Sequence, residues 1–173
     1  MFEKGNGIDN VAVGAGIGVV ECAKWRPHWK IEKYRGEALP ENLYAVEEFD
    51  GNLLLNTGIN ALLNLLIGSG TAFNYTNARI GVGDSSTAAA AAQTDLQAST
   101  NKAYAAMDAT YPQVSGQTVT FRATFGSGVA AFAWNEFVIK NNATGICLNR
   151  KVEAHGSKAS ADTWVVQVQI TIS

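Results

Sequence analysis

The sequence D-G-N-L-L-L-N-T-G-I-N-A-L-L-N-L-L-I, from Asp50 to Ile67, is the most apolar run of the chain. Its large aliphatic residues recur at the i, i+3, i+4, i+7, i+8 spacing of one helical face, at Ile59, Leu62, Leu63, Leu66 and Ile67. Further leucines at positions 53–55 and 65 widen the apolar surface beyond that face. We therefore predict one buried helix near residues 56–67 that seals a β-domain.

Strand patterns dominate the chain after this helix. Residues 118–125 and 163–172 alternate between apolar and polar side chains, which is typical of strands with one buried face. A longer strand is predicted over residues 129–140, with a bulge near Asn135 and Glu136 that restores its apolar face. Short antiparallel strands joined by glycine-rich turns predict a β-sandwich.

Size and composition predict a single globular chain that works as part of an assembly. The chain has 173 residues, 47% of them hydrophobic, and a net charge of −2. The last 122 residues contain only seven basic and six acidic side chains, which is sparse for a surface that meets only water. The apolar run at residues 11–20 is too short and too rich in glycine to span a membrane. Cys22 and Cys147 are expected as free thiols.

The residues before the helix predict an extended N-terminal arm over residues 1–50, followed by a β-sandwich domain over residues 51–173. The segment K-W-R-P-H-W-K-I-E-K-Y-R, Lys24 to Arg35, combines five basic residues with three large aromatic ones. Such a segment can bind single-stranded nucleic acid, but the overall acidity of the chain disfavours this reading. Docking to another protein subunit is the preferred interpretation, with aromatic and arginine side chains as anchors, and local packing within the chain is the alternative. The predicted anchors are Trp25, Arg26, Trp29, Tyr34 and Arg35.

Two short motifs raise the question of catalysis or cofactor binding. The glycines at positions 14, 16 and 18 lack the strand, helix and distant acid of a dinucleotide site. Gly83-Asp84-Ser85 is similar to the nucleophile motifs of some serine hydrolases, but a serine nucleophile needs a nearby base. The only histidines are His28, in the arm, and His155, which we expect exposed in a loop. We therefore predict no cofactor, no metal ion and no catalytic residue, and keep a serine hydrolase using Ser85 as a remote alternative.

The order of sequence blocks resembles small virion structural proteins of tailed bacteriophages. The blocks that carry this resemblance are E-E-F-D-G-N-L-L-L-N-T-G-I-N-A-L-L-N-L-L at Glu47–Leu66, I-G-V-G-D-S-S-T-A-A at Ile80–Ala89, Q-T-D-L at Gln93–Leu96, F-A-W-N-E-F-V-I-K-N at Phe132–Asn141, L-N-R-K-V at Leu148–Val152 and the closing T-W-V-V-Q-V-Q-I-T-I-S. They cover most of the chain after Glu47, and the block around Trp134 and the closing strand are similar to tail-fibre-associated and head-decoration groups. The resemblance implies a structural role and no catalytic residues.

Within that class, the short chain without heptads or repeats favours the capsid over an elongated fibre. The first expectation is a capsid decoration protein that binds the major capsid protein and copies of itself, with a trimer favoured at capsid three-fold positions. It would be made in the host cytoplasm, reside on the virion, and bind neither nucleic acid nor membrane. The alternative is a tail, baseplate or fibre-associated component.

Overall fold

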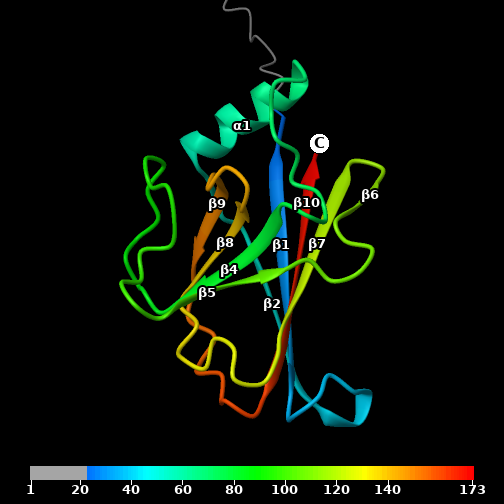
Figure 1. Ribbon diagram of the computed structural model, residues 1–173, viewed down its shortest axis with the longest axis vertical. Coiled ribbons are helices and arrows are strands. Elements are labelled where there is room, and N and C mark those ends of the chain that lie inside the picture. Colours follow the sequence, from blue (N-terminus) through cyan, green and yellow to red (C-terminus); the bar gives the residue numbers. More distant parts are fainter. Residues whose placement is uncertain (1–22) are drawn as a thin grey trace, which may run out of the picture.

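The computed structural model describes residues 23–173. In this part of the chain ten strands form two five-stranded antiparallel sheets, and the helix α1 (Asn56–Leu66) lies at one end of the molecule (Figure 1). A short 3₁₀ helix, η1 (Pro40–Asn42), lies between β1 and β2. The predicted fold class, a mainly antiparallel β-sandwich with one helix, is confirmed.

The first sheet has the strand order β2-β1-β10-β7-β6. Its two ten-residue strands, β1 and β10, pair along their whole length, from Trp25 opposite Ile172 to Tyr34 opposite Thr163. The alternation in residues 118–125 and 163–172 predicted strands with one buried face. Both segments are strands with one face in the core. The strands are β1 (Trp25–Tyr34), β2 (Leu43–Asp50), β6 (Gln113–Ser115), β7 (Thr118–Phe125) and β10 (Thr163–Ile172).

The second sheet has the order β3-β9-β8-β4-β5. Its strands are β3 (Leu53–Leu54), β4 (Ala78–Gly83), β5 (Lys102–Ala106), β8 (Glu136–Asn141) and β9 (Cys147–Val152). The single long strand expected over residues 129–140 is wrong, since only Glu136–Asn141 is a strand. Residues 126–135 connect β7 in the first sheet to β8 in the second, and Ala133 forms an isolated bridge with Ser157 there. The register shift in this region lies at Ile139/Lys140, not at the predicted Asn135–Glu136.

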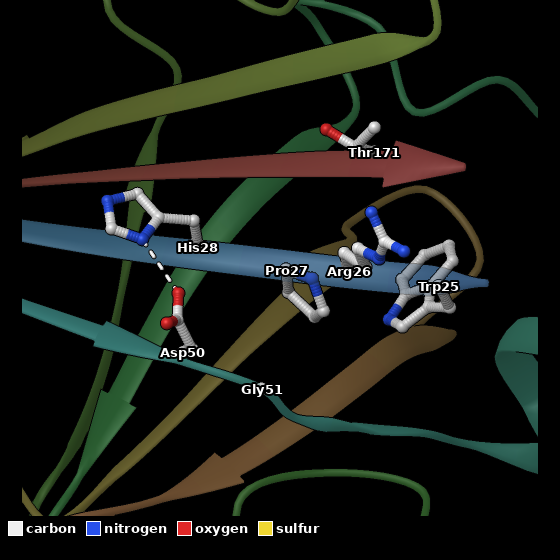
Figure 2. A pocket seen from close by; sticks show the side chains of 7 residues that line it. All are labelled: Trp25, Arg26, Pro27, His28, Asp50, Gly51 and Thr171. Carbon is white, nitrogen blue, oxygen red and sulfur yellow. Dashed lines mark hydrogen bonds and ion pairs between the residues drawn. The ribbon is translucent and has the colours of Figure 1, made fainter. Parts of the chain in front are cut away.

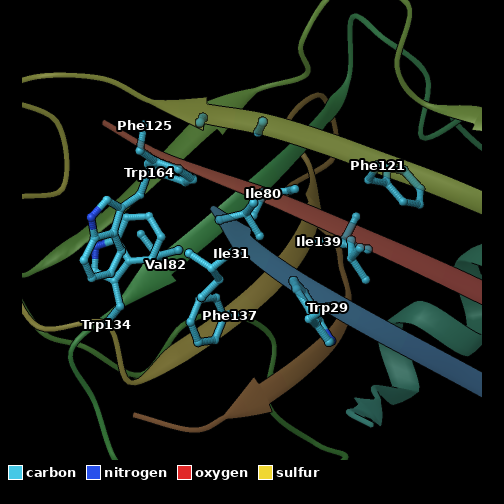
Figure 3. Close-up of a cluster of buried hydrophobic side chains, with 14 of the residues drawn as sticks. Trp29, Ile31, Ile80, Val82, Phe121, Phe125, Trp134, Phe137, Ile139 and Trp164 are labelled. Atoms are coloured by element: carbon cyan, nitrogen blue, oxygen red, sulfur yellow. The ribbon is translucent and has the colours of Figure 1, made fainter. Parts of the chain in front are cut away.

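One aromatic-rich core fills the space between the sheets (Figure 3). Trp29, Trp134 and Phe137 have no exposed surface, and Trp164 is almost as fully buried. Trp134 contacts Trp164 edge to face at 4.7 Å between ring centroids, a geometry that aromatic rings favour. Burial of such side chains is the main stabilising contribution to the sandwich.

Residues 25–50 belong to the sandwich, so the predicted arm over residues 1–50 does not hold for this part. β1 lies between β2 and β10 in the first sheet, and its side chains Trp29 and Ile31 are fully buried. Alternate residues of β1 face the core, as strand geometry requires. The basic and aromatic residues of this segment follow the same period. The remainder of the predicted arm, residues 1–22, lies outside the described residues.

The helix α1 exists where it was predicted, but it is not buried on several sides. Its buried residues are Gly58 and Ala61, whereas Leu66 is 83% exposed and Ile67, just beyond the helix, is 75% exposed. The helix contacts the end of β9 through its small residues, and Thr57 Oγ1 donates a hydrogen bond to the Cys147 carbonyl oxygen at 2.9 Å. The large aliphatic face predicted to point inward therefore points mostly outward.

Candidate functional site

A groove lies at the start of β1, at the end of the sandwich that also carries α1 (Figures 1 and 2). Its volume is about 480 Å³. We call it the β1 groove. It is lined by Trp25, Arg26, Pro27, His28, Asp50, Gly51 and Thr171. Two of the five predicted anchors, Trp25 and Arg26, therefore lie together in one concave surface.

The groove forms because β2 does not extend along the whole of β1. It ends opposite His28 and leaves the first residues of β1 uncovered on that side. The last residue pair between the two strands joins His28 to Asp50, so Trp25 and Arg26 have no partner in β2. Gly51 then turns the chain toward the second sheet with a φ of 78°, a conformation that favours glycine. Its N–H donates to the Pro27 carbonyl oxygen at 2.9 Å, which fixes the turn beside β1.

The side chains of the groove have both apolar and charged character. Trp25 is half-buried, and its indole Nε1 donates to Asn52 Oδ1 at 2.9 Å, so the ring orientation is held. Arg26 is exposed next to it. On the other side, His28 Nδ1 lies 2.8 Å from Asp50 Oδ1, and His28 Nε2 lies 3.8 Å from Glu48 Oε2. Tryptophan and arginine are the side chains most often found as anchors of protein interfaces.

The other three predicted anchors do not belong to this surface. Trp29 is in the core, stacked on Phe49 with 5.9 Å between ring centroids. Tyr34 is 9% exposed, and its hydroxyl donates to Glu32 Oε2 at 3.1 Å. Arg35 is exposed just beyond the other end of β1, where its guanidinium lies 4.8 Å from the centre of the Tyr44 ring. Only residues 29–34 of β1 lie between Arg35 and the nearest groove residue, His28, which is about 23 Å along an extended strand.

The Gly83-Asp84-Ser85 motif has a structural explanation. A Cβ atom on Gly83 would overlap the Glu136 carboxylate and lie 3.1 Å from the Ala98 Cβ. Ser85 Oγ donates to Thr87 Oγ1 at 3.0 Å and accepts from the Thr87 N–H at 3.2 Å. Both histidines contact carboxylates elsewhere, His28 with Asp50 and His155 with Glu47. The arrangement around Ser85 is that of a turn.

A buried ion pair on the second sheet was not found from the sequence. Glu136 on β8 and Arg150 on β9 are both fully buried, with 2.7 Å between Oε2 and Nη2. The Glu136 carboxylate also accepts hydrogen bonds from the backbone N–H groups of Gln97 and Ala98. Arg150 donates to Gln93 Oε1 and to the Thr87 carbonyl oxygen. The pair thus fixes the long connection at residues 84–101 against the outer face of this sheet.

A second polar cluster holds the middle of the same connection. Asp95 accepts from Lys140 Nζ at 2.5 Å and from the Tyr104 hydroxyl at 2.6 Å. Burial raises the pKa of Asp95, but hydrogen bonds from Lys140, Tyr104 and the Leu96 N–H outweigh it and leave the pKa below its usual value. Burial, with the Asp95 charge, raises the pKa of the Cys147 thiol to about 12. This thiol is therefore protonated and unreactive at neutral pH.

His155 was expected in an exposed loop, and this expectation is wrong. It is 9% exposed, its ring lies 4.0 Å from that of Phe49, and its Nδ1 lies 2.7 Å from Glu47 Oε2. Glu47 also accepts from the buried Lys33 Nζ, which donates to the His155 carbonyl oxygen as well. Burial raises the pKa of Glu47, but the hydrogen bonds from Lys33 and His155 outweigh it, so its pKa is lowered. The cluster ties β1 and β2 to the connection before β10.

The lowered pKa of Glu47 predicts a pH-dependent effect of Glu47→Gln. At pH 7 this substitution leaves the Lys33 ammonium buried without its anion, so we expect the free energy of unfolding to fall by about 1–3 kcal/mol. Glu47 contributes stability above its unfolded-state pKa, near 4.5, and loses it as the pH falls through the lower folded-state value. The difference between variant and wild type should therefore shrink as the pH falls from 5 to 3.

Urea unfolding of both proteins at several pH values measures this difference. The matched control is Glu48→Gln, because Glu48 is the neighbouring residue of β2 with a side chain 56% exposed. We expect the control to differ little from wild type at any of these pH values. A difference for Glu47→Gln that stays constant down to pH 3 would contradict the ionic role of this carboxylate.

Comparisons of the chain with protein-family models, with curated proteins and with solved structures find no match. None of the helices in residues 23–173 combines the length and the apolar character needed to cross a membrane. In the same residues, no three His, Cys, Asp or Glu side chains are grouped so that they could hold a metal ion.

Proposed function

We propose that this protein is a virion structural protein of tailed bacteriophages, and specifically a capsid decoration protein that binds the assembled shell. The observation that carries the proposal is the β1 groove, which is lined by the half-buried Trp25 and the exposed Arg26 (Figure 2). The groove directly follows the N-terminal residues 1–22, so an arm and a groove can engage the shell together. The low density of charge after Gly51 is also suited to a surface packed among other subunits.

A decoration protein stabilises a shell because it binds only the assembled state. Each groove would make a small contact, and the many identical sites of a capsid would add their contributions through multivalency. The hydrogen bond from Trp25 to Asn52 supports such a role, because a side chain that is already held in one orientation loses less conformational entropy when it binds.

The first test is the number of copies of this protein per major capsid protein in purified particles, measured by quantitative mass spectrometry. We expect a ratio near one or a simple fraction of it. A handful of copies per particle would overturn the capsid assignment and favour the tail alternative. Absence from the particles would overturn the virion proposal altogether.

The second test is binding of variants to shells stripped of this protein. Trp25→Ala with Arg26→Ala should weaken binding by at least about 10-fold, the effect expected of removing interface anchors. The control is Arg35→Ala with Leu39→Ala, which changes exposed residues beyond the other end of β1. A truncation should end before Trp25, because removal of residues up to Gly36 would delete β1. Unchanged binding by the Trp25/Arg26 variant would contradict docking through the groove.

A further inference from the structure

The outward face of α1 is an apolar stripe whose side chains are partly to largely exposed in residues 23–173. Ile59, Leu63, Leu66 and Ile67 are 41%, 56%, 83% and 75% exposed. Their i, i+4, i+7, i+8 spacing places all four side chains on one side of the helix. We call these four residues the α1 stripe. A contiguous group of large aliphatic side chains on a surface indicates an interaction site.

The stripe faces outward because small residues of α1 face the sheet. Gly58 and Ala61 are the buried residues of the helix. A Cβ atom on Gly58 would overlap the Leu148 carbonyl group, with 2.7 Å to its carbon atom. This close approach fixes the rotation of the helix about its axis. The stripe is therefore held in place by the fold, and the helix cannot turn it inward without leaving β9.

We propose that the α1 stripe is a self-association surface, on which α1 of one copy packs against α1 of a second copy. The charge distribution selects this occupant. From Asn52 to Ala78 the chain contains no Asp, Glu, Lys, Arg or His. Two identical surfaces of this kind meet without like-charge repulsion, whereas recognition of a different protein usually uses complementary charges. Closed contacts between identical patches are also the commonest interfaces of homo-oligomers.

The shape and chemistry of the stripe also suit a second helix. Aliphatic side chains at i, i+4 and i+7 form ridges that fit the grooves of another helix. The backbone groups in the middle of each helix are hydrogen-bonded within that helix, so they do not need partners across such a contact.

The test is sedimentation velocity of the full-length protein and its variants between about 1 and 300 μM, a range that includes micromolar dissociation constants. Wild-type protein should sediment as a concentration-dependent oligomer. Leu66→Glu and, separately, Ile67→Arg should raise the dissociation constant about 100-fold or more, because each places like charges against each other in the contact. Both positions are highly exposed, so thermal unfolding should show that the variants are folded.

The matched control is Val114→Glu on β6, which introduces the same charge at an apolar residue that is 77% exposed. It should associate like wild type. The proposal is overturned if wild-type protein is monomeric at 300 μM, or if the two α1 variants associate normally. It is also overturned if deletion of residues 1–22 turns a monomer into an oligomer, since that segment would then cover the stripe. All these measurements use isolated protein, so their outcome is independent of the capsid proposal.

Discussion

Arg150→Met is expected to lower the free energy of unfolding by about 3–5 kcal/mol, the usual cost of removing one partner from a buried ion pair. The Glu136 carboxylate would remain fully buried without its cation. The hydrogen bonds of Arg150 to Gln93 and to the Thr87 carbonyl oxygen would be lost as well. Urea unfolding followed by circular dichroism measures the change.

The same substitution should loosen residues 84–101 before the sandwich unfolds. This connection contains no helix or strand and is fixed at Thr87, Gln93, Gln97 and Ala98 by the Glu136–Arg150 pair. Hydrogen exchange of its amides should therefore accelerate more than exchange in β7 or β10, because a segment that loses its tethers opens locally. Equal acceleration throughout the chain would show that the pair supports the whole fold and not this connection.

A double variant separates the charge from the hydrogen bonds. Glu136→Met with Arg150→Met leaves no unpaired buried charge, so it should be less destabilised than Arg150→Met alone. Full recovery is not expected, because the N–H groups of Gln97 and Ala98 lose their acceptor. Arg79→Met is the control arginine, since within residues 23–173 Arg79 donates only to the nearby Thr76 and Ala78 carbonyl oxygens. A double variant no more stable than the single one would contradict the ionic explanation.

The sandwich was predictable from the sequence because its strands have the simple period of two. In β7 and β10 every second side chain is apolar, and a sheet with one buried face requires that pattern. The start of β1 and the end of β2 could not be predicted from the sequence in the same way. Pro27 and the mixture of basic and aromatic residues in β1 suggested an arm, although the alternating Trp25, Trp29 and Ile31 already had strand spacing.

The polar clusters could not be predicted, because their members are far apart in the chain. His155 contacts Glu47, more than one hundred residues earlier, so the local sequence of glycine and serine gave no sign of its burial. Glu136 is the first residue of the apolar strand β8, and only the register of β8 and β9 brings its partner Arg150 close. Of the candidate site, Trp25 and Arg26 were predicted, whereas the groove depends on where β2 ends.

The rotation of α1 was predicted wrongly for a reason that can be tested. Two neighbouring faces of the helix are apolar, and periodicity alone favours the one with the larger side chains. The structure buries the face with Gly58 and Ala61 instead. A helix that packs directly on the backbone of a strand needs small residues at the contact, so size and not hydrophobicity decided which face is buried.

Gly58→Ala should therefore destabilise the protein by about 3 kcal/mol, near the upper end for overpacked cores. In a free helix the same change would stabilise by about 1 kcal/mol, because alanine is the better helix former. Here the added methyl group would overlap the Leu148 carbonyl group, and the backbone of β9 cannot move aside as a side chain could. The helix would have to lift from β9, which would also break the hydrogen bond from Thr57 to the Cys147 carbonyl oxygen.

The control for this prediction is Asn60→Ala, an exposed position on the same helix. It adds helix propensity without a new contact, so the free energy of unfolding should stay within about 0.5 kcal/mol of wild type or rise slightly. Urea unfolding of the two variants gives opposite signs if Gly58 sets the distance between α1 and β9. A neutral or stabilising Gly58→Ala would mean that the helix can rotate, and the α1 stripe would then lose the fixed orientation on which its proposed pairing depends.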